Sequence, residues 1–156
     1  MRSLLIILLL LTGQTHAVEP ITPADAPIVI YQSDETYDDL KDALVSAIEG
    51  QGIKITSTLH IGSMLARTAA DTGLTDKIYA KAESLEFCSI PLSYKMSQAH
   101  PANMATCPLT LSIYQKAGDE TSTYIAFRRP RMLGDAGAAE QALMAFLDGI
   151  VQETLE

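Results

Sequence analysis

The chain has 156 residues, of which 47% are hydrophobic, and its 19 acidic and 11 basic side chains give a net charge of −8. This length suits one domain with a single hydrophobic core. The acidity argues against nucleic acid and anionic membrane surfaces as partners, because both bind to a cationic protein face.

The first residues predict export. A positive start at Arg2 is followed by the apolar run Leu4–Leu11 and by small residues at Thr15 and Ala17, the arrangement of a secretory signal peptide. The apolar run is far shorter than the roughly 20 residues of a membrane-spanning helix. We therefore expect a signal peptide over residues 1–17 and a periplasmic or secreted protein without membrane attachment after cleavage.

The mature chain is expected to begin with a short leader. Residues 18–27 contain three prolines and show no periodicity, which is typical of an extended segment. A single α+β domain should then occupy residues 28–156. The β-branched and aromatic run 28–32 predicts its first strand. A helix should follow, capped by Thr36 and ended near Gly50.

The middle of the chain alternates between strand and helix patterns. Residues 53–61 predict a half-buried strand, residues 64–70 are weakly helical, residues 82–90 predict a third strand, and residues 92–99 predict a short helix. The strand pattern over 53–61 places four apolar residues on one face: Ile53, Ile55, Leu59 and Ile61.

The last part of the chain predicts a hairpin and a long helix. Alternation returns at Cys107 and again over residues 121–128, with a polar turn at Gly118 between the two strands. The final helix should run from Asp135 to about Glu153, with apolar residues at helical spacing. The fold class predicted by this order is α+β: a single, roughly five-stranded, largely antiparallel sheet with helices packed on one face.

Several of these segments together resemble a known family. The segments TYDDLKDALVSAIEGQG, AHPANM leading into CPLTLSIYQ, and TYIAFRRP are similar to the bacterial family catalogued as domain of unknown function 302, over residues 28–150. The most specific parts of the likeness are Cys88, Pro101, Cys107-Pro108 and Arg128-Arg129-Pro130. The resemblance implies a compact α+β domain, often a homodimer, with no assigned activity and no established catalytic residues.

The two cysteines, Cys88 and Cys107, allow three interpretations. In an exported protein two cysteines usually pair, and closing a loop of this length contributes about 3 kcal/mol to stability. Two buried reduced thiols, or a ligand or redox role, are the alternatives. The spacing favours none of them, so Cys88 and Cys107 are disulfide candidates with the other two interpretations open.

A soft-metal site is a further hypothesis. Met96 and His100 lie one helical turn apart, and Met104 and Cys107 follow. Thioether, thiolate and imidazole ligands suit copper(I), and a His/Met pair ligates non-covalent haem. The alternative interpretation is that the methionines fill the core while His100 ends a helix. The leading interpretation of this chain needs no cofactor, and copper or haem belongs to the alternative.

A third candidate site is the arginine cluster Arg128, Arg129 and Arg131 at the end of a strand. Guanidinium groups hold carboxylate or phosphate through paired N–H donors. Arginines on an acidic protein also pair with surface carboxylates, which is the other interpretation. The sequence thus offers an anion-binding site here without deciding for it.

No catalytic motif accompanies these candidates, since G-x-S-x-G, S-x-x-K and H-E-x-x-H are all missing. We therefore expect an exported α+β domain that binds a small ligand or a periplasmic protein and that, as the family resemblance implies, forms a homodimer. A non-enzymatic role is favoured over an enzyme, which is the third choice. The alternative from another class is a periplasmic soft-metal or thiol-redox accessory protein.

Overall fold

A computed structural model describes residues 17–156, except for the side chain at position 70. Strands and helices alternate along this part of the chain. Residues 1–16, and with them nearly all of the expected signal peptide, lie outside the described residues. The elements are β1 (Ile28–Ser33), α1 (Tyr37–Gly50), β2 (Ile55–Leu59), α2 (Ile61–Thr72), β3 (Tyr79–Phe87), α3 (Ile90–Ala99), the 3₁₀ helix η1 (Pro101–Thr106), β4 (Leu109–Lys116), β5 (Asp119–Arg128) and α4 (Gly137–Leu155). None of the described helices is long and apolar enough to cross a membrane.

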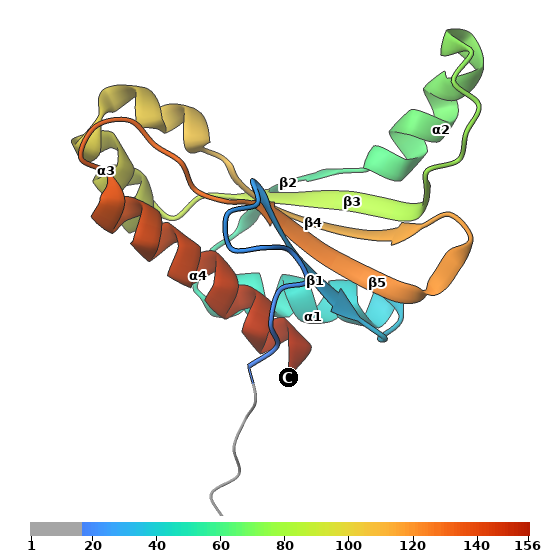
Figure 1. Cartoon of the computed structure of the whole chain (residues 1–156), viewed down its shortest axis with the longest axis horizontal. Coiled ribbons are helices and arrows are strands. Elements are labelled where there is room, and N and C mark those ends of the chain that lie inside the picture. The colour runs from blue at the N-terminus through green and yellow to red at the C-terminus, as the bar shows by residue number, and fades with distance from the viewer. Residues whose placement is uncertain (1–16) are drawn as a thin grey trace, which may run out of the picture.

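The five strands form one sheet in the order β1-β5-β4-β3-β2, and every neighbouring pair is antiparallel (Figure 1). β4 and β5 make the expected hairpin. Their turn contains Gly118 at φ 79°, a left-handed backbone conformation that glycine adopts without steric cost. The predicted α+β class with one antiparallel sheet is confirmed.

Helices α1 and α4 cover one face of the sheet (Figure 1). The Thr36 hydroxyl accepts a hydrogen bond from the Asp39 backbone N–H at 3.3 Å, which starts α1 as the sequence predicts. The buried residues of α1 recur every three or four positions, so that one stripe faces the sheet. They are Tyr37, Leu40, Leu44, Ala47 and Ile48.

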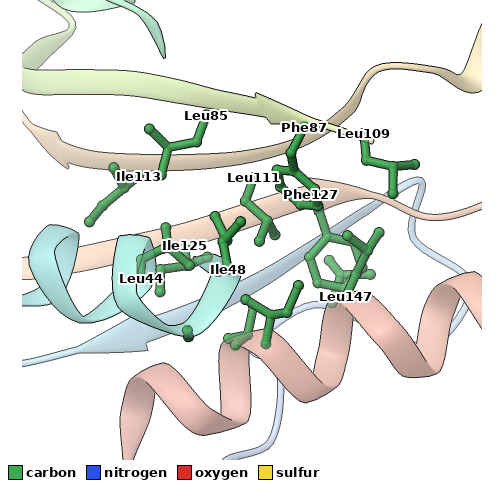
Figure 2. Packing of buried hydrophobic residues seen from close by; sticks show 14 of the residues in the cluster. Leu44, Ile48, Leu85, Phe87, Leu109, Leu111, Ile113, Ile125, Phe127 and Leu147 are labelled. Carbon is green, nitrogen blue, oxygen red and sulfur yellow. The ribbon is translucent and has the colours of Figure 1, made fainter. Parts of the chain in front are cut away.

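The hydrophobic core lies between this face of the sheet and the two helices, as Figure 2 shows. Alternate residues of the three central strands point inward and meet side chains of α1 and α4. The labelled members are Leu44, Ile48, Leu85, Phe87, Leu109, Leu111, Ile113, Ile125, Phe127 and Leu147. Fully burying one such side chain contributes about 1.5–3 kcal/mol, so this layer dominates the stability of the fold.

Strand β2 departs from the face assignment that its sequence predicts. Ile55 pairs with Phe87 on the core face, but the register shifts before Ser57, and Leu59 pairs with Ser84 on the opposite face. The expectation that Ile55 and Leu59 share one face is therefore wrong. A β-bulge adds one residue to the strand, and the alternation after it is reversed.

The third strand and helix α2 also differ clearly from their predicted bounds. The third strand ends at Phe87 instead of residue 90, because Pro91 occupies the first turn of α3, where proline is tolerated, and Ile90 begins that helix. Helix α2 is longer than expected, and beyond its first turn it projects away from the sheet (Figure 1).

The leader is attached to the domain. The Val18 N–H donates to Gln152 Oε1 at 2.8 Å, and Gln152 Nε2 donates to the Val18 carbonyl at 2.8 Å. The Ile21 N–H donates to the Ile30 carbonyl, also at 2.8 Å. Residues 18–27 thus run beside β1 and the end of α4.

Candidate functional site

The face of the sheet opposite α1 and α4, which we call the open face, carries short side chains at its centre. Ser84 pairs with Ser112, and Ser112 with Ala126, so three small residues lie side by side on β3, β4 and β5. The Ser84 and Ser112 hydroxyls hydrogen-bond to each other at 2.8 Å. Both hydroxyls thereby gain a hydrogen-bond partner within the sheet. Because these side chains are shorter than their neighbours, they leave space above the centre of the open face.

These short side chains form the floor of a hollow of about 930 Å³, which we call the trough and which also reaches Leu143 and Leu147 of α4 on the other side of the sheet. One wall is the segment 105–108 after η1 together with residues 129–131, and the other is Leu59 with Ile61. Leu59 reaches this wall because of the bulge in β2, which turns it from the core face to the open face.

A row of polar side chains crosses the trough next to its floor. Glu86 pairs with Thr110, and the register that pairs Ser112 with Ala126 places Arg128 on the other side of Thr110. The row therefore presents a carboxylate, a hydroxyl and a guanidinium on three adjacent strands. Within the described part of the chain, neither the Glu86 carboxylate nor the Arg128 guanidinium has a hydrogen bond or an ion pair.

Of the three arginines predicted to bind an anion, Arg128 is the one available for it. All three line the trough. Arg129 donates from Nε to the Ala26 carbonyl at 2.8 Å and so holds the leader against the domain. Arg131 donates to the carbonyl of its neighbour Pro130 at 3.3 Å. The anion site stays a prediction, and within it Arg128 carries the main role.

Asn103, which the sequence analysis did not single out, holds the wall formed by η1 in place. Its buried amide donates to the carbonyls of Met96 and Leu133, each at 3.0 Å, and its Oδ1 accepts from the Leu133 N–H at 2.9 Å. Gly134, at φ 77°, passes so close that a Cβ there would lie 2.4 Å from the Ala99 carbonyl oxygen. Loop 129–136 is thus locked to the end of α3.

The cysteines lie next to each other at one end of the trough. Phe87 pairs with Leu109, so Cys88 and Cys107 sit at the adjoining ends of β3 and β4, and Cys107 lines the trough. Burial raises the pKa of the Cys88 thiol, and the charge and hydrogen bond of Cys107 raise this pKa further. Both cysteines are free thiols in this structure, and Ser93 Oγ lies 3.1 Å from Cys107 Sγ. The disulfide stays a prediction that this proximity supports.

The four predicted soft-metal ligands occupy different surroundings. Met96 is 1% exposed and belongs to the hydrophobic core, whereas Met104 is 69% exposed on η1. His100 Nδ1 accepts from the Ala102 N–H at 3.1 Å and so caps η1. Among residues 17–156, no group of three or more His, Cys, Asp or Glu side chains is placed to hold a metal ion. Met96 thus serves core packing, and the copper or haem site with Cys107 stays a prediction.

Comparison with known proteins places this fold in a family. The family described as "Domain of unknown function DUF302" matches residues 29–154. This chain belongs to the DUF302 family. The resemblance seen in the sequence is thereby confirmed.

One solved structure supports the same fold for this DUF302 domain. It is the crystal structure of an uncharacterized conserved DUF302 protein from Bacillus stearothermophilus, with a TM-score of 0.63 and 14% identity, and the match covers 83% of this chain and 98% of that chain. At this identity the likeness shows the fold alone. No curated protein matches the chain.

A second polar cluster of the DUF302 domain lies away from the trough, around Glu83. Its Oε1 is 2.7 Å from His60 Nδ1, and its Oε2 forms an ion pair with Lys41 of α1. Burial by itself raises the pKa of Glu83, but the hydrogen bonds and charges of Lys41 and His60 outweigh it and hold this pKa below its usual value. Since His60 immediately precedes α2, the cluster ties α1 and β3 to the start of α2. Sequence patterns did not predict this cluster, because its members are far apart in the chain.

Proposed function

We propose that this DUF302 domain is an exported, non-enzymatic binding module that takes a small amphiphilic molecule with an anionic group into the trough. The observation that carries the proposal is Arg128, whose guanidinium lies beside a floor of short side chains and has no partner within the described part of the chain. The apolar body of the ligand would lie on the floor, and its anionic group would meet Arg128.

The size and chemistry of the trough suit such a ligand. Its volume of about 930 Å³ falls within the range of small-molecule sites, roughly 300–1,000 Å³. Guanidinium binds carboxylate, sulfonate or phosphate through two parallel hydrogen bonds. On a protein of net charge −8, a site that attracts an anion needs a local cation, and Arg128 supplies one. Glu86 and Thr110 in the same row would orient the remaining polar groups of the ligand.

Export is the part of the proposal that rests on residues 1–17 alone. The positive start, the apolar run and the small residues before Val18 support it. Expression of the full chain in a Gram-negative host should yield a periplasmic protein whose N-terminal residue is Val18. A cytoplasmic product that retains Met1 would contradict export and leave the binding proposal intact.

The binding proposal is tested with 1-anilinonaphthalene-8-sulfonate, a fluorophore that joins an aromatic body to one anionic group. We expect saturable binding to the folded protein. The substitution Arg128→Gln should raise the dissociation constant about tenfold, equivalent to about 1.4 kcal/mol. Ala126→Leu, which fills the floor, should weaken binding by a similar factor.

Lys95→Gln is the matched control for this experiment. Lys95 is an exposed residue of α3, so the substitution removes the same charge from a position outside the trough. Its dissociation constant should equal that of the parent protein. Equal binding by the parent, Arg128→Gln and Lys95→Gln would refute the trough as an anion site.

A further inference from the structure

Among the described α-helices, α2 is the one that contributes no residue to the hydrophobic core. Only its first turn packs closely on the sheet, where a Cβ at Gly62 would lie 3.0 Å from the backbone N of Ala82. Beyond that turn the helix points away from the rest of the molecule (Figure 1). A helix of about three turns is marginal in water unless one of its faces is packed.

The segment around α2 exposes an unusual amount of apolar surface. Five of its large hydrophobic side chains are between 39% and 73% exposed: Leu59, Met64, Leu65, Leu74 and Ile78. Ile61, Met64 and Leu65 follow the spacing of an amphipathic helix over the first part of α2, and the same side continues with the small residues Thr68, Ala69 and Thr72. Exposed apolar side chains gathered on one segment are typical of an interaction surface.

We propose that α2 of one copy of this chain lies across the trough of a second copy, and that the second copy returns the same contact. Each copy has one helix that lacks a packing partner and one sheet face that lacks a cover. In a dimer with a two-fold axis, α2 of each copy gains a packing partner and the open face of each copy is covered, because the same pair of surfaces meets twice. Each α2 then roofs the trough of the other copy.

The dimensions of the two surfaces agree. The 12 residues of α2 make a helix of about 18 Å, at 1.5 Å per residue. The strands β3, β4 and β5 that form the floor span about 10 Å between the outer strand axes, at about 4.8 Å per strand spacing. The part of α2 beyond its first turn, about eight residues or about 12 Å, is therefore still long enough to cross the three strands of the floor.

Charge favours a second copy as the occupant that uses α2. The protein has a net charge of −8, so two copies repel each other over most of their surfaces. The segment 61–78 has two basic and two acidic side chains and is neutral: Arg67, Asp71, Asp76 and Lys77. Contact through α2 therefore avoids the repulsion that other surfaces would meet.

The apolar area is sufficient for a specific dimer. With about 200 Å² for a fully exposed side chain of this size, the four exposed residues outside the trough, Met64, Leu65, Leu74 and Ile78, would remove on the order of 400 Å² from water in each copy, or about 800 Å² in the pair. The covered floor and walls add to this value. The sum lies in the range of specific protein interfaces, which begins near 1,000 Å².

The dimer would complete the binding site, and in this respect the inference rests on the proposed function. In one copy the trough is open along the sheet, whereas under α2 of the second copy a ligand would be enclosed between the floor and the apolar side of the helix. Desolvation under this roof strengthens the ion pair between Arg128 and an anionic group. Ligand binding and dimer formation should therefore favour each other.

The experiment measures the mass in solution by size-exclusion chromatography with light scattering, on residues 18–156 at micromolar concentration. The parent protein should be a dimer. Leu65→Glu and Met64→Glu on α2 should each weaken the dimer at least tenfold. Ile28 of β1 pairs with Arg128 and also lines the trough, so Ile28→Glu should have the same effect. Ile90→Glu is the matched control, because Ile90 is 83% exposed on α3 and lies outside both surfaces. Circular dichroism establishes that each variant is folded.

The inference would be overturned by a monomeric parent protein, by α2 variants that remain dimers, or by a dimer that Leu65→Glu breaks but Ile28→Glu leaves intact. The last result would place α2 against a different surface. A parent protein that forms a complex only with another protein would also overturn it. If the protein is a monomer and sulfonate binding still depends on Arg128, the dimer is refuted and the proposed function stands. If the protein is an α2-dependent dimer and Arg128→Gln does not change sulfonate binding, the proposed function is refuted and the dimer stands.

Discussion

The ion pair between Glu83 and Lys41 should make a measurable contribution to the stability of the fold, because the Glu83 carboxylate is largely buried. The Glu83 side chain is 15% exposed, and the substitution Glu83→Gln keeps its shape while removing its charge. The Lys41 ammonium would lose its carboxylate partner in a partly buried position, while the largely exposed His60 contributes less. We expect a loss of about 2 kcal/mol, and a fall in Tm of about 5 °C for a domain of this size.

The pH dependence of this loss tests its cause. Folding lowers the pKa of Glu83, so its contribution is fully present above the pKa of an unfolded glutamate and disappears as the pH falls through the lower folded value. Thermal melts of both proteins at about pH 7 and about pH 3 should therefore show a difference that shrinks in acid. Other carboxylates titrate in both proteins and cancel in the comparison.

The control is Asp38→Asn, which breaks the exposed ion pair between Asp38 and Lys81, with atoms 2.7 Å apart. Exposed pairs contribute little, so this change should cost less than about 0.5 kcal/mol. If Glu83→Gln costs no more than Asp38→Asn, or costs the same at both pH values, the reasoning about a partly buried charge is wrong.

The remaining predictions concern the walls of the trough. Asn103→Ala removes three hydrogen bonds from a buried position and should lower the free energy of unfolding by about 2–4 kcal/mol, as measured by thermal melting. It should also weaken sulfonate binding. An unchanged Tm would show that loop 129–136 does not depend on Asn103. Protein purified from the periplasm should have no titratable thiol, and reduction should lower its stability by about 3 kcal/mol; two free thiols in fresh, non-reduced protein would contradict the disulfide of Cys88 with Cys107.

Local pattern was enough to predict much of the fold. The cap at Thr36 and the spacing of Leu40, Leu44 and Ile48 define α1 without reference to any other segment. The hairpin of β4 and β5 follows equally from alternation on both sides of Gly118. These features depend on residues within one or two turns of each other, so the printed order of the side chains contains the information.

The candidate site was predicted only in part. Arg128, Cys88 and Cys107 were identified from their residue types and their position at strand ends. Glu86 and the serines of the floor were missed, because a polar residue that alternates with apolar ones in a strand looks like any solvent-facing residue. The cluster of Glu83, Lys41 and His60 was missed for a related reason, since its members lie 19 or more residues apart in the sequence.

The sequence by itself determined the single domain, the antiparallel α+β class and the family, because periodicity, capping and turn residues act locally. Only the tertiary structure decided what surrounds the open face. Two long helices cover one side of the sheet, the bulge in β2 sends Leu59 to the other side, and α2 leaves the sheet after one turn. These outcomes depend on strand register and on how helices pack, which involve contacts between distant segments. The trough, and the helix that we propose roofs it in a second copy, arise from those contacts.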